Sequence, residues 1–164
     1  MFVRKWVICV FSYNRGALLH NLVTSIRTHY PQFSIAIFDD GSKNENTLQV
    51  LSKLKRDNIA VQQGDSNAES KHGGLYLQMN KALQYALQNS YTYAYFVQDD
   101  MQFLWRDNLL ELKVVQAFSH QECIMCNSSF LQKILKEGIE DRLPYVKPGL
   151  YSFTPNGVAH TGII

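Results

Sequence analysis

Short apolar runs alternate with longer stretches of helical periodicity over residues 6–97. Nearly continuous apolar runs occupy residues 6–11, 35–38 and 93–97, and a shorter one occupies residues 59–61. Such runs are typical of strands that are covered on both faces. Strands that alternate with helices form βαβ units, so the sequence predicts an α/β fold with a Rossmann-like, mostly parallel sheet flanked by helices.

The helices predicted between these strands are marked by apolar stripes with helical spacing. Each stripe is expected to face the sheet. The first comprises Leu18, Leu19, Leu22, Val23 and Ile26, the second Leu48, Leu51 and Leu54, and the third Leu75, Met79, Leu83 and Leu87. Beyond residue 105 the pattern weakens, and residues 109–118 are predicted to form one more helix.

Composition excludes several classes of protein. A net charge of +2 without a basic face argues against a nucleic-acid partner. No apolar run reaches the roughly 18 residues that a transmembrane helix needs. Three cysteines, an odd number, argue against a disulfide framework and favour a reducing compartment. We therefore expect a cytoplasmic protein, with peripheral association with a membrane as an alternative.

Polar residues follow three of the predicted strands where each strand ends, at residues 12–15, 39–42 and 98–100. In an open parallel sheet, ligands bind beyond the carboxyl ends of the strands. Four carboxylates would then converge on one edge of the sheet, which is unfavourable unless a positive charge neutralises them. A divalent cation that bridges to a phosphate would do so, and hard oxygen ligands suit Mg²⁺ or Mn²⁺.

Each of these segments also has a purely structural interpretation. Residues 39–42, Asp-Asp-Gly-Ser, form a good turn, because Asp caps it and Gly adopts a positive φ. Residues 99–100 could begin a helix, Asn14 could cap the first helix and Tyr13 could lie in the core. Their order, each directly after an apolar strand, favours the functional interpretation.

With these motifs in this order, the sequence resembles the nucleotide-binding part of the inverting family 2 glycosyltransferases, which have the GT-A fold. The resemblance covers roughly residues 3–105 and includes Gly73, Gly74 and Asn80, which are similar to the family's glycine-then-helix segment. It implies a metal-dependent enzyme that moves a sugar from a nucleotide-diphosphate donor, a UDP-sugar, to an acceptor hydroxyl with inversion. The implied acceptor is a saccharide or a lipid-linked molecule, as in polysaccharide biosynthesis.

The resemblance also implies roles for individual residues. Tyr13 would pack on uracil and Asp40 would hold the base. The family's DXD-like metal motif maps onto Asp99 and Asp100, with Asp100 as the direct ligand of a metal that bridges the diphosphate; Gln98 stands where a first acid is common. The expected nucleotide-binding residues are Ser12, Tyr13, Asn14, Arg15, Asp39, Asp40, Lys71 and Asp99.

The catalytic residue stays unknown, because the family's base is an acid well downstream of the metal motif. Asp141 is a candidate, although it also reads as a solvated helix terminus. His160 is a candidate for the base or a metal ligand, or it is structural. We expect a single GT-A-like domain over residues 1–164, with a nucleotide-sugar part at 1–105 and the start of an acceptor part at 106–164. Because the chain stops on an apolar run, the sequence is expected to be C-terminally incomplete.

Two other functions stay open at this stage. A sugar-nucleotide binding module without turnover would have the same motifs but no base. A sugar-phosphate nucleotidyltransferase shares the sheet but should have a glycine-rich basic loop after the first strand, where this chain has the single Gly16. A dehydrogenase would need a GxGxxG at that point, which is absent. The oligomeric state is not predicted.

Overall fold

The computed structural model describes residues 5–65, 74–119, 123, 145–147, 150–151 and 162–164. The chain divides into two compact units, residues 1–107 and 108–164. In the second unit the described elements are helix α4 (Leu110–Phe118), the antiparallel strands β5 (Tyr145–Lys147) and β6 (Leu150–Tyr151), and β7 (Gly162–Ile163). None of the helices in the described ranges combines the length and hydropathy that crossing a membrane requires.

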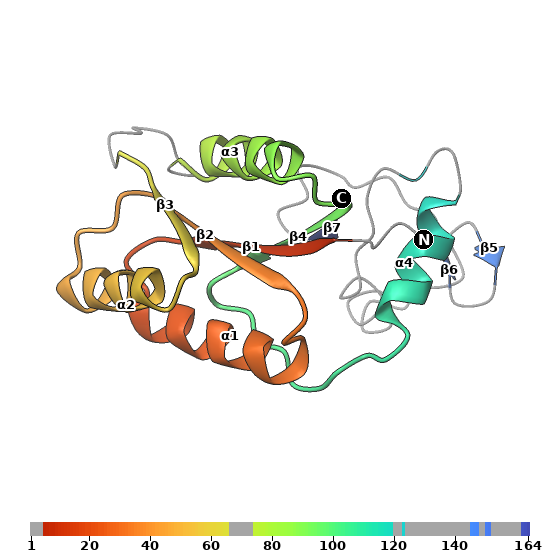
Figure 1. The fold of residues 1–164 in the computed structure, drawn as a ribbon, viewed down its shortest axis with the longest axis horizontal. Coiled ribbons are helices and arrows are strands. Elements are labelled where there is room, and N and C mark those ends of the chain that lie inside the picture. Colours follow the sequence, from red (N-terminus) through yellow and green to blue (C-terminus); the bar gives the residue numbers. More distant parts are fainter. Residues whose placement is uncertain (1–4, 66–73, 120–122, 124–144, 148–149, 152–161) are drawn as a thin grey trace. The chain divides into compact units, whose positions relative to one another are not determined.

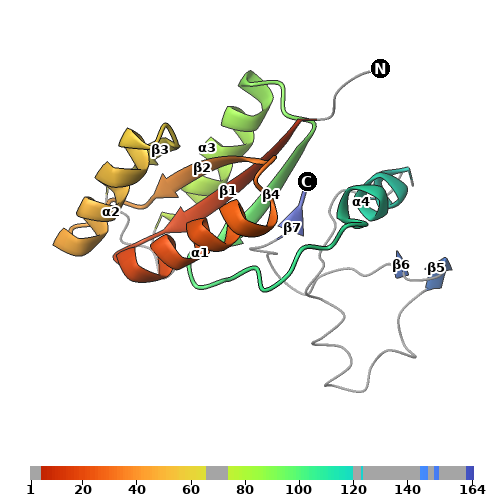
Figure 2. The same cartoon turned by 60° about the horizontal axis from the view of Figure 1, so that its bottom comes forward.

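The first unit is built on parallel strands in the order β3–β2–β1–β4. Two helices, α1 (Gly16–His29) and α2 (Glu45–Arg56), cover one face of this sheet, and α3 (Leu75–Gln88) covers the other (Figures 1 and 2). The strands are β1 (Trp6–Ser12), β2 (Ser34–Asp39), β3 (Ala60–Gln63) and β4 (Tyr93–Gln98). This confirms the predicted α/β fold with a mostly parallel sheet flanked by helices.

The central strand β1 determines where the loops meet. Every residue of β1 is buried, as its unbroken apolar run predicts. In the register of the sheet, Ser12 pairs with Asp39 of β2, and Phe11 pairs with Gln98 of β4. The residues that follow these three strands therefore emerge at the same edge of the sheet.

The strand order creates a switch point at this edge. From β1 the chain moves outward through β2 to β3, and then returns through α3 to place β4 on the opposite side of β1. In doubly wound sheets, the connections on the two sides of such a point leave on opposite faces and open a crevice at the carboxyl ends of the strands. Strand order therefore makes the ends of β1 and β4 the expected place for a binding site.

The first two predicted apolar stripes face the core, apart from Leu18 and Leu48, which are exposed. The third stripe also lies in a helix, α3, as predicted, but its four residues are not the ones that this helix buries. In α3 the buried residues are Gln78, Ala82 and Ala86, whereas Leu87 is 77% exposed. Small alanine side chains let the helix backbone approach the sheet closely, so the larger leucines flank this contact instead of filling it.

Gln78 is an unusual residue for this buried face. It is only 1% exposed, and neither of its amide atoms has a hydrogen-bond partner in the described part of the chain. A buried polar group without a partner costs about 1–3 kcal/mol. Gln78→Met keeps the length of the side chain and removes both polar atoms, so it should raise the free energy of unfolding by about 1–2 kcal/mol.

Urea denaturation of the two proteins measures this difference. Gln78→Ala is the matched control and should lower the free energy of unfolding, because it leaves a cavity. A loss of stability in the methionine variant would contradict the prediction and would mean that the amide is hydrogen-bonded in solution.

Candidate functional site

The loops after β1, β2 and β4 are tied together at the carboxyl edge of the sheet. The Asp40 N–H donates to the Ser12 carbonyl at 2.9 Å, and the Asp99 N–H donates to the Phe11 carbonyl at 3.0 Å. Most of the site residues predicted from the sequence belong to these loops: Ser12, Tyr13, Asn14, Arg15, Asp39, Asp40, Asp99 and Asp100. Lys71, Asp141 and His160 lie outside the described residues.

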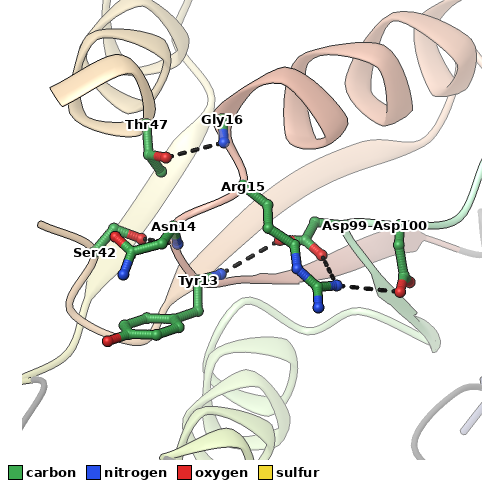
Figure 3. Close-up of polar contacts among 8 residues, drawn as sticks. All are labelled: Tyr13, Asn14, Arg15, Gly16, Ser42, Thr47, Asp99 and Asp100. Carbon is green, nitrogen blue, oxygen red and sulfur yellow. Dashed lines mark hydrogen bonds and ion pairs between the residues drawn. The ribbon is translucent and has the colours of Figure 1, made fainter. Parts of the chain in front are cut away.

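Asn14 connects the first loop to the second. Its backbone is left-handed, with φ 53°, and its N–H donates to the Ser42 Oγ at 2.7 Å (Figure 3). Its side-chain Oδ1 accepts from the N–H groups of Lys43 at 2.8 Å and Asn44 at 2.9 Å. Asn tolerates this backbone conformation better than most residues. One side chain thus sets the path of both loops.

Replacement of Asn14 separates these two contributions. Asn14→Ala loses both the bonds from Oδ1 and the tolerance of a positive φ, so we expect the free energy of unfolding to fall by about 2–3 kcal/mol. Asn14→Gly restores the backbone freedom but not the acceptor and should lose about 1–2 kcal/mol. Chemical denaturation measures both values. Equal stability of the alanine variant and the wild type would show that the two loops do not depend on this contact.

Gly16 begins α1 directly against α2. Its N–H donates to the Thr47 Oγ1 at 2.9 Å (Figure 3). A Cβ on residue 16 would lie 2.7 Å from the Thr47 Cα, which is backbone and cannot move aside cheaply. The glycine is therefore required for this close approach of the two helix starts.

Asp39 is the last residue of β2, and its side chain points into the turn that follows. It is fully buried, and its carboxylate accepts from both the N–H and the hydroxyl of Ser42. Its carbonyl accepts from the Gly64 N–H at 2.7 Å, next to the end of β3. The structure therefore places the Asp39 carboxylate in the interior of the turn, where it organises the loop.

Asp40 points toward the start of α3. Its Oδ2 accepts from the Gly74 N–H at 2.6 Å, and a Cβ on residue 74 would collide with the same carboxylate. A helix N-terminus carries partial positive charge, which favours a carboxylate at this point. The bond to Gly74 holds Asp40 while Oδ1 has no hydrogen-bond donor among the described residues.

The acidic pair after β4 is bound by Arg15. The Arg15 Nη1 lies 3.4 Å from Asp99 Oδ1 and 3.2 Å from Asp100 Oδ2, so one guanidinium contacts both carboxylates (Figure 3). Asp99 is only 4% exposed and also accepts from the Tyr13 N–H at 3.3 Å, whereas the Asp100 side chain is half exposed.

The buried position of Asp99 raises its pKa above the ordinary value. The Ser12 hydroxyl, the Tyr13 N–H and the Arg15 charge act in the opposite direction, and the Asp100 charge raises the pKa further. Burial disfavours the charged carboxylate, whereas the nearby Arg15 charge favours it.

The pair fits a divalent cation that arrives with a phosphate. In the described part of the chain, no group of three or more His, Cys, Asp or Glu side chains could hold a metal ion. Mg²⁺, however, is commonly held by one or two carboxylates, with phosphate and water completing its coordination. Asp99 and Asp100 offer the hard oxygen donors that such an ion prefers.

The Tyr13 ring gives the site a flat apolar surface. Its backbone is fixed by Asp99, yet the residue is 49% exposed. In Figure 3 the ring extends away from the ion pairs of Arg15. An exposed aromatic ring beside a cation and two carboxylates can accept a ligand that has both a planar base and a charged group.

Several residues of the network were missed in the sequence: Ser42, Asn44, Thr47 and Gly74 do not appear among the predicted site residues. The sequence does contain spacings that indicate two of these contacts. The spacing of Asp39 and Ser42 is that of a side chain that caps its own turn. The spacing of Asn44 and Thr47 is that of a helix N-cap, and the Asn44 Oδ1 accepts from the Thr47 N–H at 3.2 Å. Nothing in the sequence indicates that Gly74 meets Asp40.

The parallel sheet, and the acidic and aromatic residues at its switch point, are the features that the sequence motifs predict for a glycosyltransferase with the GT-A fold. Residues 7–104 match the family model described as glycosyl transferase family 2. The chain belongs to this family, as its sequence motifs predict. A comparison with curated proteins gives no significant match.

Solved structures that are similar to the chain include two glycosyltransferases with a bound sugar nucleotide. The crystal structure of Staphylococcus aureus TarS 1–349 in complex with UDP-GlcNAc has 23% identity and a TM-score of 0.49, and the alignment covers 71% of this chain and 32% of that one. The mannosyltransferase PcManGT from Pyrobaculum calidifontis, in complex with GDP-Man and Mn²⁺, has 16% identity and a TM-score of 0.46, with 66% and 31% covered. The chain thus spans about a third of the length of these structures.

Proposed function

We propose that the protein transfers a sugar, with inversion, from a UDP-sugar to a hydroxyl of a saccharide or lipid-linked acceptor. The observation that carries the proposal is the meeting of Tyr13, Asp40 and the Asp99–Asp100 pair at the switch point of a family 2 glycosyltransferase sheet. A cytoplasmic location is part of the proposal.

The nucleoside would bind between the first two loops. The half-exposed ring of Tyr13 offers a stacking surface for the base, and bases stack on aromatic side chains irrespective of sequence. Asp40 has one carboxylate oxygen fixed by Gly74 and a second that can accept from a ring N–H of uracil. Asn14 and Asp39 act as positioning residues, because their contacts set the two loops.

The diphosphate would bind near the acidic pair. Asp100, with Asp99 behind it, would hold Mn²⁺ or Mg²⁺. A divalent cation there supplies Lewis acidity that stabilises negative charge on a leaving diphosphate. Arg15 is the described cation nearest to these carboxylates and would lie beside the same phosphate groups.

Inversion requires the acceptor hydroxyl to attack the anomeric carbon from the face opposite the leaving diphosphate, while a base removes the hydroxyl proton. None of the described site residues suits this base, since Asp99 and Asp100 belong to the diphosphate side. Asp141 and His160 remain proposals for it, with residues 106–164 as part of the acceptor side. Alignment of donor and acceptor would supply much of the rate.

The proposed base pocket predicts a preference for uridine. UDP should bind about tenfold more tightly than ADP, because adenine has no ring N–H to donate to Asp40 and leaves that carboxylate unpaired. Titration calorimetry with Mn²⁺ measures both affinities. Equal affinities would contradict the role of Asp40, and GDP belongs in the panel as a base that also has a ring N–H donor.

The reaction itself is tested by turnover. The chain is incubated with Mn²⁺ and a panel that includes UDP-GlcNAc and GDP-mannose, and release of the nucleoside diphosphate is measured with and without saccharide acceptors. Acceptor-stimulated release supports glycosyl transfer. Tight donor binding without release would instead assign the chain as a sugar-nucleotide binding module.

A further inference from the structure

The Arg15 side chain already places a positive charge on the acidic pair after β4. Arg15 Nη1 lies within 3.4 Å of Asp99 and 3.2 Å of Asp100, so a single nitrogen bridges the two carboxylates. Arg keeps its charge at any accessible pH, so this positive charge is permanent. The same two carboxylates are the groups proposed above to hold a divalent cation. A divalent cation and the guanidinium on the same pair of carboxylates would repel each other.

We propose that Arg15 is a placeholder cation, whose guanidinium neutralises the Asp99–Asp100 pair until a divalent cation displaces it. This inference rests on the proposed function, since it concerns the metal and the diphosphate of that reaction. It gives Arg15 two successive partners: the carboxylates in the empty site, and the diphosphate once the metal has taken the carboxylates.

The geometry allows this exchange. The Arg15 backbone is held where α1 begins: its carbonyl accepts from the Leu19 N–H at 3.0 Å. Its side chain, in contrast, is 53% exposed, so it can swing without disturbing the core. Ion pairs at such exposed positions contribute little to stability, so leaving Asp100 costs little.

The burial of Asp99 is the reason why a positive charge is favourable here before a metal ion binds. Its carboxylate is almost completely buried beside a second carboxylate, where an uncompensated negative charge is unfavourable. The Tyr13 N–H also bonds to it, so the position of Asp99 fixes the backbone below the stacking ring. A cation beside this pair offsets that cost, and Arg15 supplies it when no metal is present.

Coupling between metal and nucleotide follows from this arrangement. A metal ion alone must displace Arg15 into water, whereas a metal ion that arrives with a diphosphate provides Arg15 with a new anionic partner. Mn²⁺ should therefore bind weakly alone and more tightly with UDP, and by linkage UDP should gain the same factor from Mn²⁺. Replacement of Arg15 should weaken this coupling.

The decisive experiment measures Mn²⁺ binding without nucleotide, from the electron paramagnetic resonance signal of free Mn²⁺. Arg15→Met keeps much of the side-chain length without the charge and should bind Mn²⁺ roughly tenfold more tightly than the wild type. Arg27→Met is the matched control, because Arg27 makes a similar exposed ion pair with Asp57 at 3.4 Å, and it should leave Mn²⁺ affinity unchanged. The double variant Arg15→Met/Asp100→Asn should lose the gain.

The direction of the change separates this proposal from a merely structural role. If Arg15 only held the loops together, its removal would spread the carboxylates and weaken Mn²⁺ binding. Equal or weaker binding by Arg15→Met, or no measurable binding by any variant, would overturn the placeholder role. Because no nucleotide is present, this result is independent of the proposed sugar transfer. A failure to bind UDP would count against the proposed function and not against a gain in Mn²⁺ affinity.

Discussion

Asp100→Asn is expected to weaken Mn²⁺-dependent binding of UDP by roughly 100-fold, because it removes the charged oxygen proposed to hold the metal beside the diphosphate. The Asp100 side chain is half exposed, and among the described residues its ion pair is with the exposed end of Arg15, so the variant should fold normally. Titration calorimetry with UDP, in the presence and absence of Mn²⁺, measures the effect.

A matched control for Asp100 lies on the same unit. Asp57 also pairs with an arginine at 3.4 Å, with its side chain 36% exposed, and Asp57→Asn should leave UDP affinity unchanged. Asp99→Asn should destabilise the fold as well as weaken binding, because Asp99 anchors the Tyr13 N–H. If Asp100→Asn binds Mn²⁺ and UDP as well as the wild type, the metal site lies elsewhere.

Tyr13→Ala should weaken nucleotide binding by roughly 10- to 100-fold, since stacking of a base on an aromatic ring contributes about 1–3 kcal/mol. The thermal stability of this variant should be close to that of the wild type, because the ring is 49% exposed and the contact that fixes the loop comes from the backbone N–H. Tyr13→Phe retains the stacking surface and should bind UDP within about threefold of the wild type.

Together, the two Tyr13 variants distinguish a stacking role of the ring from a role in the stability of the fold. A core residue would lower stability when truncated to alanine, and phenylalanine would not fully restore binding if the hydroxyl made the contact. If the UDP affinity of Tyr13→Ala, measured under the same conditions, equals that of the wild type, the base does not stack on Tyr13.

The fold was largely predictable because burial of the central strands leaves an unambiguous pattern. The apolar runs at residues 6–11, 35–38 and 93–97 all lie in strands, since backbone pairing and burial on both faces demand apolar side chains along the whole run. The face of α3 was not predictable in the same way. Its buried residues are Gln78, Ala82 and Ala86, and the Tyr85 ring contacts Phe38 of β2. The positions of the leucines give no indication of this face.

The meeting of the loops at the site was predictable from strand order, but the partners of each carboxylate were not. Strand order alone does not distinguish residues 39, 40, 99 and 100, and the resemblance to the family gives them roles but not their partners within the chain. In the structure Asp39 caps its own turn, Asp40 meets the start of α3, and Asp99 and Asp100 share Arg15. These differences depend on the direction in which each loop leaves the sheet, and side-chain direction in a loop has no periodicity to reveal it.

The central claim is that a nucleoside diphosphate and a divalent cation bind where β1 and β4 end. Crystals of the protein soaked with UDP and Mn²⁺ test it most directly, because the anomalous signal of manganese locates the metal independently of the nucleotide. The predicted result is a manganese peak within coordination distance of the Asp100 carboxylate, with uracil against the Tyr13 ring and Arg15 turned toward the diphosphate. A manganese peak away from Asp99 and Asp100, or uracil at another place on the sheet, would contradict the account.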